Sequence, residues 1–223
     1  MAGMINKYDE SKAFDYENGF YLTSPISRMS NILSHYELYK RIVELPGDVV
    51  ELGVFKGGSF FQFAAFREVL ENEMSRKLIG FDVFGEFPKA HSDGDRKFRE
   101  KWVKETMGDY LTRDEIQSSL LHRNIGNTEL VKGDVADTIP AYLKEHPYMK
   151  IALLHIDVDI YEPTMIGLTY LYERVVRGGI IILDDYGVAG ETEAVDEFIK
   201  DKNVEIRRLP ISQFKPAYIK IEK

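Results

Sequence analysis

Short apolar runs separated by helix-length segments recur along the 223-residue chain and constrain its fold more than any other feature. Runs such as "DVVELG" (48–53) and "KIALLHIDVD" (150–159) are apolar on both faces, which is typical of strands covered by helices on both sides. The predicted strands are 48–53, 77–84, 128–134, 150–159, 178–187, 204–210 and 217–222. Apolar residues at helical spacing predict helices within 60–75, 137–146, 162–176 and 191–202. This order predicts an α/β fold: a doubly wound, roughly seven-stranded, mostly parallel sheet with a C-terminal antiparallel hairpin.

Two segments lie outside this alternation, although the length favours a single domain, 1–223. Residues 1–46 form an N-terminal helical extension, and residues 85–127 form a charged helical insertion after the second strand. Ligands of open α/β sheets bind beyond the carboxyl ends of the strands, so we expect both segments to cover a site there. The candidate acceptor-binding residues in the insertion are Lys89, His91, Arg96, Arg99 and Trp102.

The bulk composition excludes several classes of function. The net charge of −8 argues against binding of nucleic acid or of an anionic membrane, which depends on clustered Lys and Arg, and favours a small-molecule partner. With no cysteine, the chain has no disulfide, thiolate zinc site or cysteine nucleophile. No segment has the pattern of a signal peptide or a membrane span, so we expect a cytoplasmic protein. The aromatic-rich N-terminal segment indicates a homo-oligomer.

The stretch "VVELGVFKGGSF" (49–60) predicts a strand, a glycine turn and a helix. Gly53 lets the chain turn off the strand, while Gly57 and Gly58 allow a ligand to approach the backbone at the start of the helix. Such a turn suits dinucleotides, phosphates and S-adenosylmethionine alike. The carboxylate of Glu51 would repel a pyrophosphate and suit the cationic amino-acid end of S-adenosylmethionine.

Acidic residues also follow the next two predicted strands. Asp82 lies at the end of the second strand, where it can accept hydrogen bonds from a ribose diol. Asp134 ends the third strand, close enough in this topology to receive an adenine amino group. Either aspartate could equally be a helix cap or a loop residue.

Four more aspartates, Asp157, Asp159, Asp184 and Asp185, end the fourth and fifth predicted strands. These strands are neighbours in a doubly wound sheet, so their carboxylates should converge at one edge of the cleft. A hard oxygen ligand set suits Mg²⁺, with Ca²⁺ or Mn²⁺ as alternatives. Residues i and i+2 of a strand face the same way, so Asp157 and Asp159 could both face the cleft, one as ligand and one as base. His155 is a second candidate base.

Six motifs, in this order and spacing, resemble the macrocin O-methyltransferase (TylF-type) family of S-adenosylmethionine-dependent enzymes from about residue 22 onward. They are "GDVVELGVFKGGS", "GFDVFGEFP", "VKGDVADTIP", "LLHIDVDIYEPT", "GGIIILDDYG" and "ETEAVDEF". The chain departs from the family pattern at Phe55 and Lys56, where tryptophan and arginine are frequent, and at Val158, often glycine. None of these changes removes a ligand.

The resemblance implies a class I methyltransferase that binds Mg²⁺ and methylates a hydroxyl of a sugar in a natural product or glycan, with vicinal hydroxyls as the group held. It implies that Asp157, Asp184 and Asp185 hold the metal and that Asp159 is the general base. The cofactor S-adenosylmethionine would be held by Thr23, Ser24, Glu51, Gly53, Gly57, Gly58, Ser59, Asp82 and Asp134.

Two other enzyme classes share parts of this pattern. "DVDIY" followed by "DD" has features of a Mg²⁺-dependent phosphohydrolase of the haloacid dehalogenase type, but Tyr161 stands where that pattern has threonine or valine. A nicotinamide-dependent oxidoreductase would need G-x-G-x-x-G in place of G-x-x-x-G-G and would leave the aspartates without a role. A cofactor-binding protein without activity is a third alternative, disfavoured by the complete acidic set.

Overall fold

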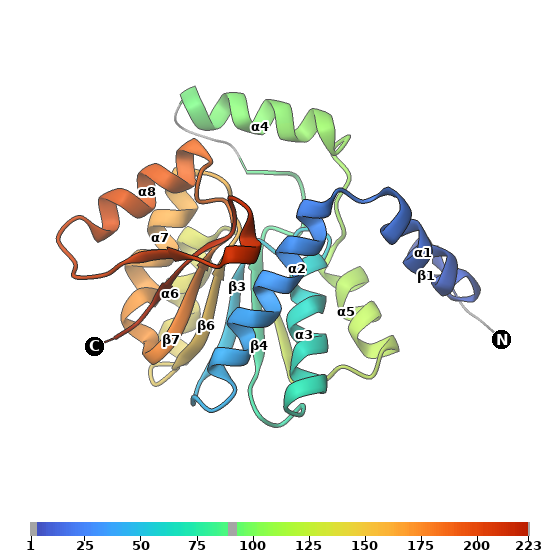
Figure 1. Cartoon of the computed structure of the whole chain (residues 1–223), viewed down its shortest axis with the longest axis horizontal. Helices are drawn as coiled ribbons and strands as arrows, with labels where there is room; N and C mark the ends of the chain where they lie inside the picture. The colour runs from blue at the N-terminus through green and yellow to red at the C-terminus, as the bar shows by residue number, and fades with distance from the viewer. Residues whose placement is uncertain (1–3, 89–92, 223) are drawn as a thin grey trace.

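A seven-stranded sheet forms the centre of the protein, as a computed structural model describing residues 4–88 and 93–222 shows (Figure 1). Its strands run in the order β5-β4-β3-β6-β7-β9-β8. Their bounds are β3 (Asp48–Leu52), β4 (Leu78–Asp82), β5 (Thr128–Lys132), β6 (Ile151–Ile156), β7 (Val175–Leu183), β8 (Ile206–Arg208) and β9 (Ala217–Lys220). All pairings are parallel except those of β9 with β7 and β8. The predicted doubly wound sheet with its C-terminal antiparallel hairpin is confirmed.

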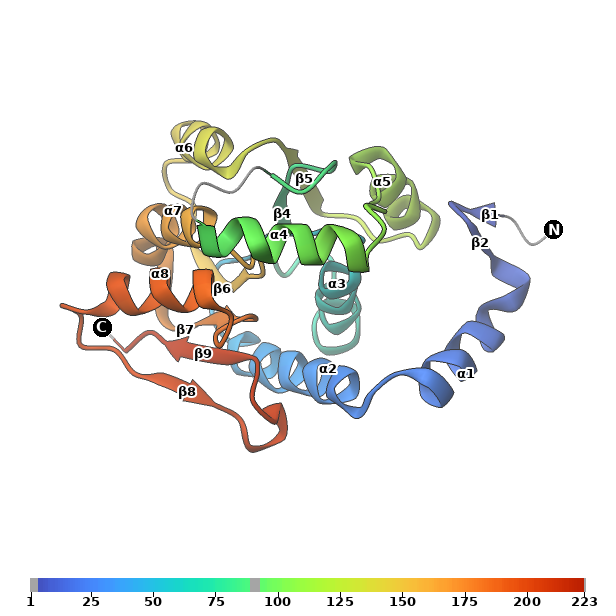
Figure 2. The same cartoon turned by 90° about the horizontal axis from the view of Figure 1, so that it is seen from above.

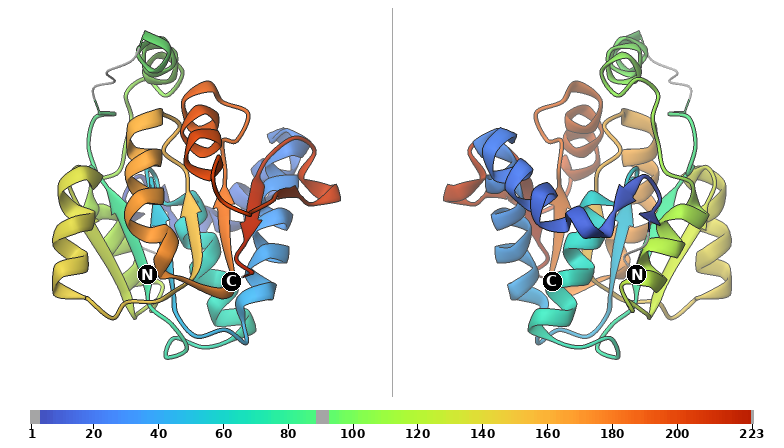
Figure 3. Two further views of the ribbon diagram at one scale, coloured as in Figure 1. Left: turned by 90° about the vertical axis from the view of Figure 1, so that its left-hand side faces the viewer. Right: turned by 90° about the vertical axis from the view of Figure 1, so that its right-hand side faces the viewer.

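Helices cover both faces of this sheet (Figure 3). One face carries α6 (Val135–Glu145), α7 (Tyr161–Leu171) and α8 (Ala189–Ile199), and the other carries α2 (Ile26–Tyr39), α3 (Gly58–Leu70) and α5 (Arg113–His122). Alternate residues of a strand serve opposite faces: Val50 and Leu52 pack in the core on the α6–α7 side, and Val49 packs with Phe60 and Phe63 on the α2–α3 side. The described residues also contain short 3₁₀ turns: η1 (Glu10–Lys12), η2 (Lys40–Ile42), η3 (Tyr172–Arg174) and η4 (Pro210–Ser212).

The N-terminal extension consists of two parts with different packing. A small hairpin of β1 (Met4–Ile5) and β2 (Tyr8–Asp9) contacts α5, where Asn6 Nδ2 donates to Ser119 Oγ at 3.1 Å. The following helix α1 (Ala13–Thr23) has no buried residue and extends away from the sheet (Figure 2). By contrast, α2 packs into the core. The exposed apolar side chains of α1 are consistent with the predicted homo-oligomer, which stays a prediction.

The insertion after β4 supplies α4 (Asp93–Glu105), which runs above the carboxyl ends of the strands (Figure 1), and then α5. Asp95 anchors α4 across the sheet, because its Oδ2 accepts from the backbone N–H of Tyr161, the first residue of α7, at 3.3 Å. A carboxylate at this position also matches the positive end of the helix dipole. The insertion is therefore fixed over the sheet edge where the aspartates gather.

Two predicted strands end earlier than expected. β6 stops at Ile156, and β7 stops at Leu183, so the four aspartates lie in loops beyond the strands. The strand alternation used to orient Asp157 and Asp159 is therefore wrong, and Asp159 has a left-handed φ of 63°. No helix of the described residues has the length and apolar content needed to cross a bilayer.

Candidate active site

A cavity opens at the carboxyl ends of the strands, beneath α4. Its walls come from the loops after β3, β4, β5 and β6, from the first two turns of α7 and from the insertion. Among its lining residues are Gly53, Asp82, Asp134, Asp157 and Asp159, all predicted for this site. Three of the aromatic side chains that line it, those of Phe55, Phe87 and Trp102, lie together. The ring centroids of Trp102 lie 4.7 Å from Phe55 and 5.1 Å from Phe87, so this wall is apolar and closely packed.

The glycine loop is held tightly against the neighbouring strand ends. Gly53 has a φ of +87°, and a Cβ there would lie 1.8 Å from the carbonyl oxygen of Asp157. The loop N–H groups of Val54 and Phe55 donate to Asp82 Oδ2 at 2.8 and 2.9 Å. The other Asp82 oxygen accepts from the N–H of Phe84. Asp82 thus shapes the loop and faces the cavity at once, and burial raises its pKa against the opposing effect of these hydrogen bonds.

Asp134 combines two roles in a similar way. It is the N-cap of α6, with its Oδ1 accepting from the N–H of Ala136 at 2.9 Å, and it lines the cavity beside Gly133. Asp134 is therefore a helix cap and a cavity-lining residue at the same time.

Asp157, Asp184 and Asp185 come together as predicted from the strand order. One carboxylate oxygen of each lies within 4.8 Å of the others. Burial and the negative charges of Asp184 and Asp185 raise the pKa of Asp157 well above its usual range. Burial and Asp185 likewise raise the pKa of Asp159 to about 9. These carboxylates repel one another, and a hard divalent cation would relieve that repulsion with the oxygen ligands it prefers, so the donor set fits Mg²⁺.

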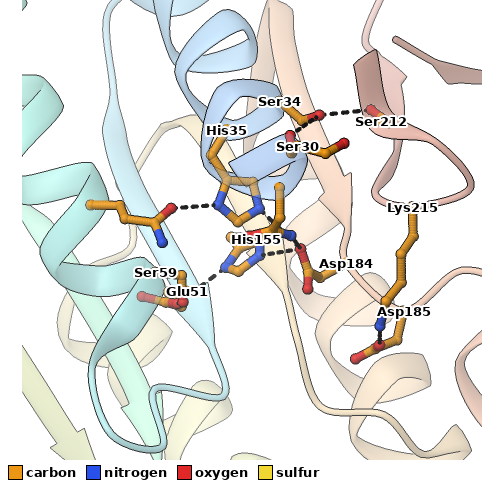
Figure 4. A network of polar contacts seen from close by, with 12 residues as sticks. Ser30, Ser34, His35, Glu51, Ser59, His155, Asp184, Asp185, Ser212 and Lys215 are labelled. Carbon is orange, nitrogen blue, oxygen red and sulfur yellow. Dashed lines mark hydrogen bonds and ion pairs between the residues drawn. The ribbon is translucent and has the colours of Figure 1, made fainter. Parts of the chain in front are cut away.

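Asp184 differs from its neighbours because histidines hold it ionised. Burial opposes its charge, but hydrogen bonds from His155 and His35 outweigh that effect and place the pKa of Asp184 well below its usual range. His35 Nε2 lies 2.9 Å and His155 Nε2 3.5 Å from Asp184 Oδ1. Lys215 adds a positive charge on the far side, where its Nζ pairs with Asp185 Oδ1 (Figure 4).

Glu51 faces the interior of the protein, away from the cavity. Its side chain is fully buried, and its Oε1 binds Ser59 Oγ and lies 3.1 Å from His155 Nδ1. Neither Glu51 nor Ser59 is among the residues that line the cavity. Glu51 and Ser59 belong to a buried polar network that runs through His155 to Asp184 of the aspartate cluster, where His35 joins it (Figure 4).

The remaining predicted residues lie at the edge of the site or outside it. Thr23, at the end of α1, is exposed and donates to the carbonyl of Gly19, and Ser24 follows it; neither lines the cavity. Gly57 and Gly58 lie at the start of α3 and do not line the cavity either. Arg99 holds the loop before α4 through the carbonyl oxygens of Phe87 and Pro88. Arg96 lies on α4, while Lys89 and His91 lie outside the described residues.

Several residues of the site carry no sequence signal. Asn31, His35 and Lys215 reach the aspartates from segments about 30 to 150 residues away in the chain, with no motif or spacing to mark them. Tyr110, from the insertion, lines the cavity without belonging to any motif, whereas Glu162, which also lines it, lies within the motif "LLHIDVDIYEPT". Only the tertiary packing of α2 and the C-terminal loop brings the first group to the site.

Comparison with known proteins decides the family. The sequence model of the macrocin-O-methyltransferase (TylF) family matches residues 25–214. The chain belongs to this family. It is 33% identical over 177 residues, 74% of the chain, to mycinamicin III 3''-O-methyltransferase of Micromonospora griseorubida. It is 31% identical over 161 residues, 69% of the chain, to demethyldecarbamoylnovobiocin O-methyltransferase of Streptomyces niveus. The matched regions span 66% and 58% of these two relatives.

Solved structures of methyltransferases share the fold of this TylF-family chain. The crystal structure of CalS11, a calicheamicin methyltransferase, superposes with a TM-score of 0.71 at 29% identity, covering 93% of this chain and 84% of that one. The O-methyltransferase NovP superposes with a TM-score of 0.74 at 23% identity, covering 86% of this chain and 79% of that one, which supports the fold.

Proposed function

We propose that this protein is an S-adenosylmethionine-dependent O-methyltransferase that uses a bound divalent cation, Mg²⁺, and methylates a sugar hydroxyl of a natural product. The observation that carries the proposal is that two features meet at one cavity. The glycine loop pinned by Asp82 lines it, and so does Asp157, whose carboxylate lies within 4.8 Å of those of Asp184 and Asp185. The two relatives named above are O-methyltransferases by name, and a third, from Streptomyces olivaceus, is named as the 4'-O-methyltransferase of a rhamnosyl-tetracenomycin.

Different residues of the cavity would bind the cofactor and accept the proton in such a reaction. The loop of Gly53 and the side chains of Asp82 and Asp134 would hold the cofactor, and in-line placement of oxygen, methyl and sulfur would contribute to the rate. When bound, the cation would supply the positive charge that lowers the pKa of an acceptor hydroxyl beside it. Asp159 would take the hydroxyl proton on a carboxylate oxygen. Its pKa of about 9 means that it is protonated at neutral pH until positive charge reaches the cluster.

The acceptor side of the cavity has an acidic and an aromatic wall. Asp159 and Glu162 suit hydrogen bonds to sugar hydroxyls, and Phe55, Phe87 and Trp102 offer an apolar surface for the rest of a natural product. A neighbouring pair of sugar hydroxyls is the acceptor group we propose, because two oxygens can be held between cation and base at the same time.

Two measurements test the halves of this proposal separately. S-adenosylhomocysteine should raise the melting temperature of the protein and NAD should not; the reverse result would instead favour the oxidoreductase alternative. Methyl transfer to a panel of glycosides should disappear after rigorous metal removal, return with Mg²⁺, and be lost in Asp157→Asn. Transfer that survives both metal removal and this substitution would refute the metal half alone, and phosphate release from phosphoesters would favour the phosphohydrolase.

A further inference from the structure

Two segments outside the strand-end loops converge on the aspartate cluster (Figure 4). From α2, Asn31 Nδ2 donates to Asp184 Oδ1 at 3.0 Å, and His35 Nε2 lies 2.9 Å from the same oxygen. From the loop between η4 and β9, Lys215 Nζ contacts Asp185 Oδ1. Both contacts from α2 to Asp184 thus fall on one oxygen of its carboxylate.

The same two segments are joined to each other. Ser30 Oγ donates to the carbonyl oxygen of Ile211, and Ser34 Oγ lies 2.8 Å from Ser212 Oγ, with both Ser34 and Ser212 fully buried. His35 is held at its second nitrogen as well, because Nδ1 lies 3.1 Å from Gln62 Oε1 on α3. The imidazole ring therefore has its orientation fixed from both sides, independently of any ligand.

We propose that Asn31 and His35 are positioning residues for the cation ligand Asp184. They hold Oδ1, so that Oδ2 is the oxygen left for the cation shared with Asp157 and Asp185. This inference rests on the cation site of the proposed function and extends it to α2. Partners that orient a ligating carboxylate are as much a part of a metal site as the ligand, and losing one costs about tenfold to a hundredfold in metal affinity.

A reciprocal effect on α2 follows from this arrangement. If docking of α2 favours the cation-binding form of Asp184, then cation binding must favour docking of α2 by the same free energy. The backbone N–H groups of α2 should consequently exchange more slowly with solvent in the presence of the cation. A residue that only filled space in the core would not link cation binding to the docking of α2.

The alternative is that His35 only packs, since its ring lies 5.2 Å from Phe63 and 4.9 Å from His155 between centroids. His35→Phe separates the two roles, because it keeps a ring in this place and removes the contact to Asp184. His35→Gln returns an amide donor to the position. Asn31→Ala removes the second contact from a half-buried residue, which should leave folding intact.

The experiment is a titration of the full-length, metal-free protein with Mn²⁺, followed by the electron paramagnetic resonance signal of the free ion, with hydrogen exchange of α2 measured in parallel. A matched control is Tyr218→Phe, which breaks a different contact between the N- and C-terminal parts, the 2.8 Å hydrogen bond from Arg41 Nη1 to Tyr218 Oη. We expect Asn31→Ala and His35→Phe to raise the Kd for Mn²⁺ about tenfold or more. His35→Gln should recover part of that loss, and the control should stay within about twofold of wild type, as for an uncoupled site.

The outcomes separate this inference from the proposed function. Wild-type Mn²⁺ affinity in both Asn31→Ala and His35→Phe, with or without a lower melting temperature, would overturn the positioning role and leave the cation site standing. Unchanged hydrogen exchange of α2 on Mn²⁺ binding would also count against it. A wild-type protein that binds S-adenosylhomocysteine but not Mn²⁺ would overturn the cation half of the proposed function and this inference with it.

Discussion

Gly53 lies against the backbone of Asp157, where the glycine loop meets the loop after β6. A Cβ at this position would lie 1.8 Å from Asp157 O, and Cβ atoms essentially never come within 3.0 Å of such an atom, so Gly53→Ala must move the two backbones at least 1.2 Å apart. The displaced segments are joined by the 2.9 Å hydrogen bond from Asp157 N to Leu52 O. Substitution therefore disturbs the glycine loop and the first aspartate of the cluster together.

The cost has two parts. Forcing an alanine into a left-handed φ of +87° costs about 1 to 2 kcal/mol. Stretching or losing the buried backbone hydrogen bond adds about 1 to 3 kcal/mol. The free energy of unfolding should thus fall by about 2 to 5 kcal/mol, a large share of the stability of an ordinary domain.

The same loop provides a matched control in Gly58. Nothing lies within 4 Å of a Cβ built there, and the residue is the first of α3, without a positive φ. Gly58→Ala should therefore leave the protein as stable as wild type or stabilise it by about 0.4 to 1 kcal/mol through the unfolded chain. Urea unfolding followed by far-ultraviolet circular dichroism, in EDTA and without cofactor, measures both variants. A Gly53→Ala protein within 1 kcal/mol of wild type, or a strongly destabilised Gly58→Ala protein, would refute this reasoning.

Three further predictions concern charges and the cavity. In Lys215→Met, the Kd for Mn²⁺ should fall about tenfold or more, because the variant removes the ammonium that contacts Asp185. An ammonium and a divalent cation about 5 Å apart repel by about 1.7 kcal/mol even at the dielectric constant of water. Calorimetry showing weaker binding would contradict this. Asp109, whose pKa hydrogen bonds from Lys56 and Lys7 lower to about 2, should contribute stability above its unfolded pKa near 4 that is lost as the pH falls toward 2. Carboxyl NMR should accordingly show a midpoint near 2 that rises in Lys56→Met, and a midpoint near 4 in wild type would be evidence against the pairing. The single tryptophan, Trp102, lines the cavity, so its fluorescence should change on titration with S-adenosylhomocysteine or acceptor, and a signal that stays constant while calorimetry detects binding would contradict its placement.

The sheet and the meeting of the aspartates could be predicted from the sequence because both follow from strand order. Fully apolar runs identify strands buried on both faces, and parallel neighbours bring Asp157 and Asp184 to one edge whatever the loops do. The strand ends were less accurate, since "HIDVDI" has no glycine or proline to mark the end of β6 at Ile156. The convergence was therefore correct although the argument from strand alternation was not.

Glu51 shows why side-chain direction could not be predicted. In a sheet covered on both faces, a period-two pattern does not tell which residues face a cavity and which face a helix layer. Glu51 pairs in register with His155 on the adjacent strand, so the two side chains share the α2–α3 face and meet in the interior. Only the register between β3 and β6, together with the packing of α2, places Glu51 next to His155 and outside the cavity wall.

The buried network also explains how so many charges can lie beneath one site. Ser59 and Gln62, both on α3, contact Glu51 and His35, while His155 links Glu51 to Asp184. Both carboxylates of this network, those of Glu51 and Asp184, have an imidazole beside them, which offsets much of the cost of removing them from water. Asp157 and Asp159 lack such a partner among the described residues and show raised pKa values instead. The cluster thus contains one carboxylate, Asp184, whose charge the histidines stabilise, one, Asp185, that pairs with Lys215, and one, Asp157, whose raised pKa a bound cation would lower. Helix α3 supports the first of them, because its Gln62 contacts His35.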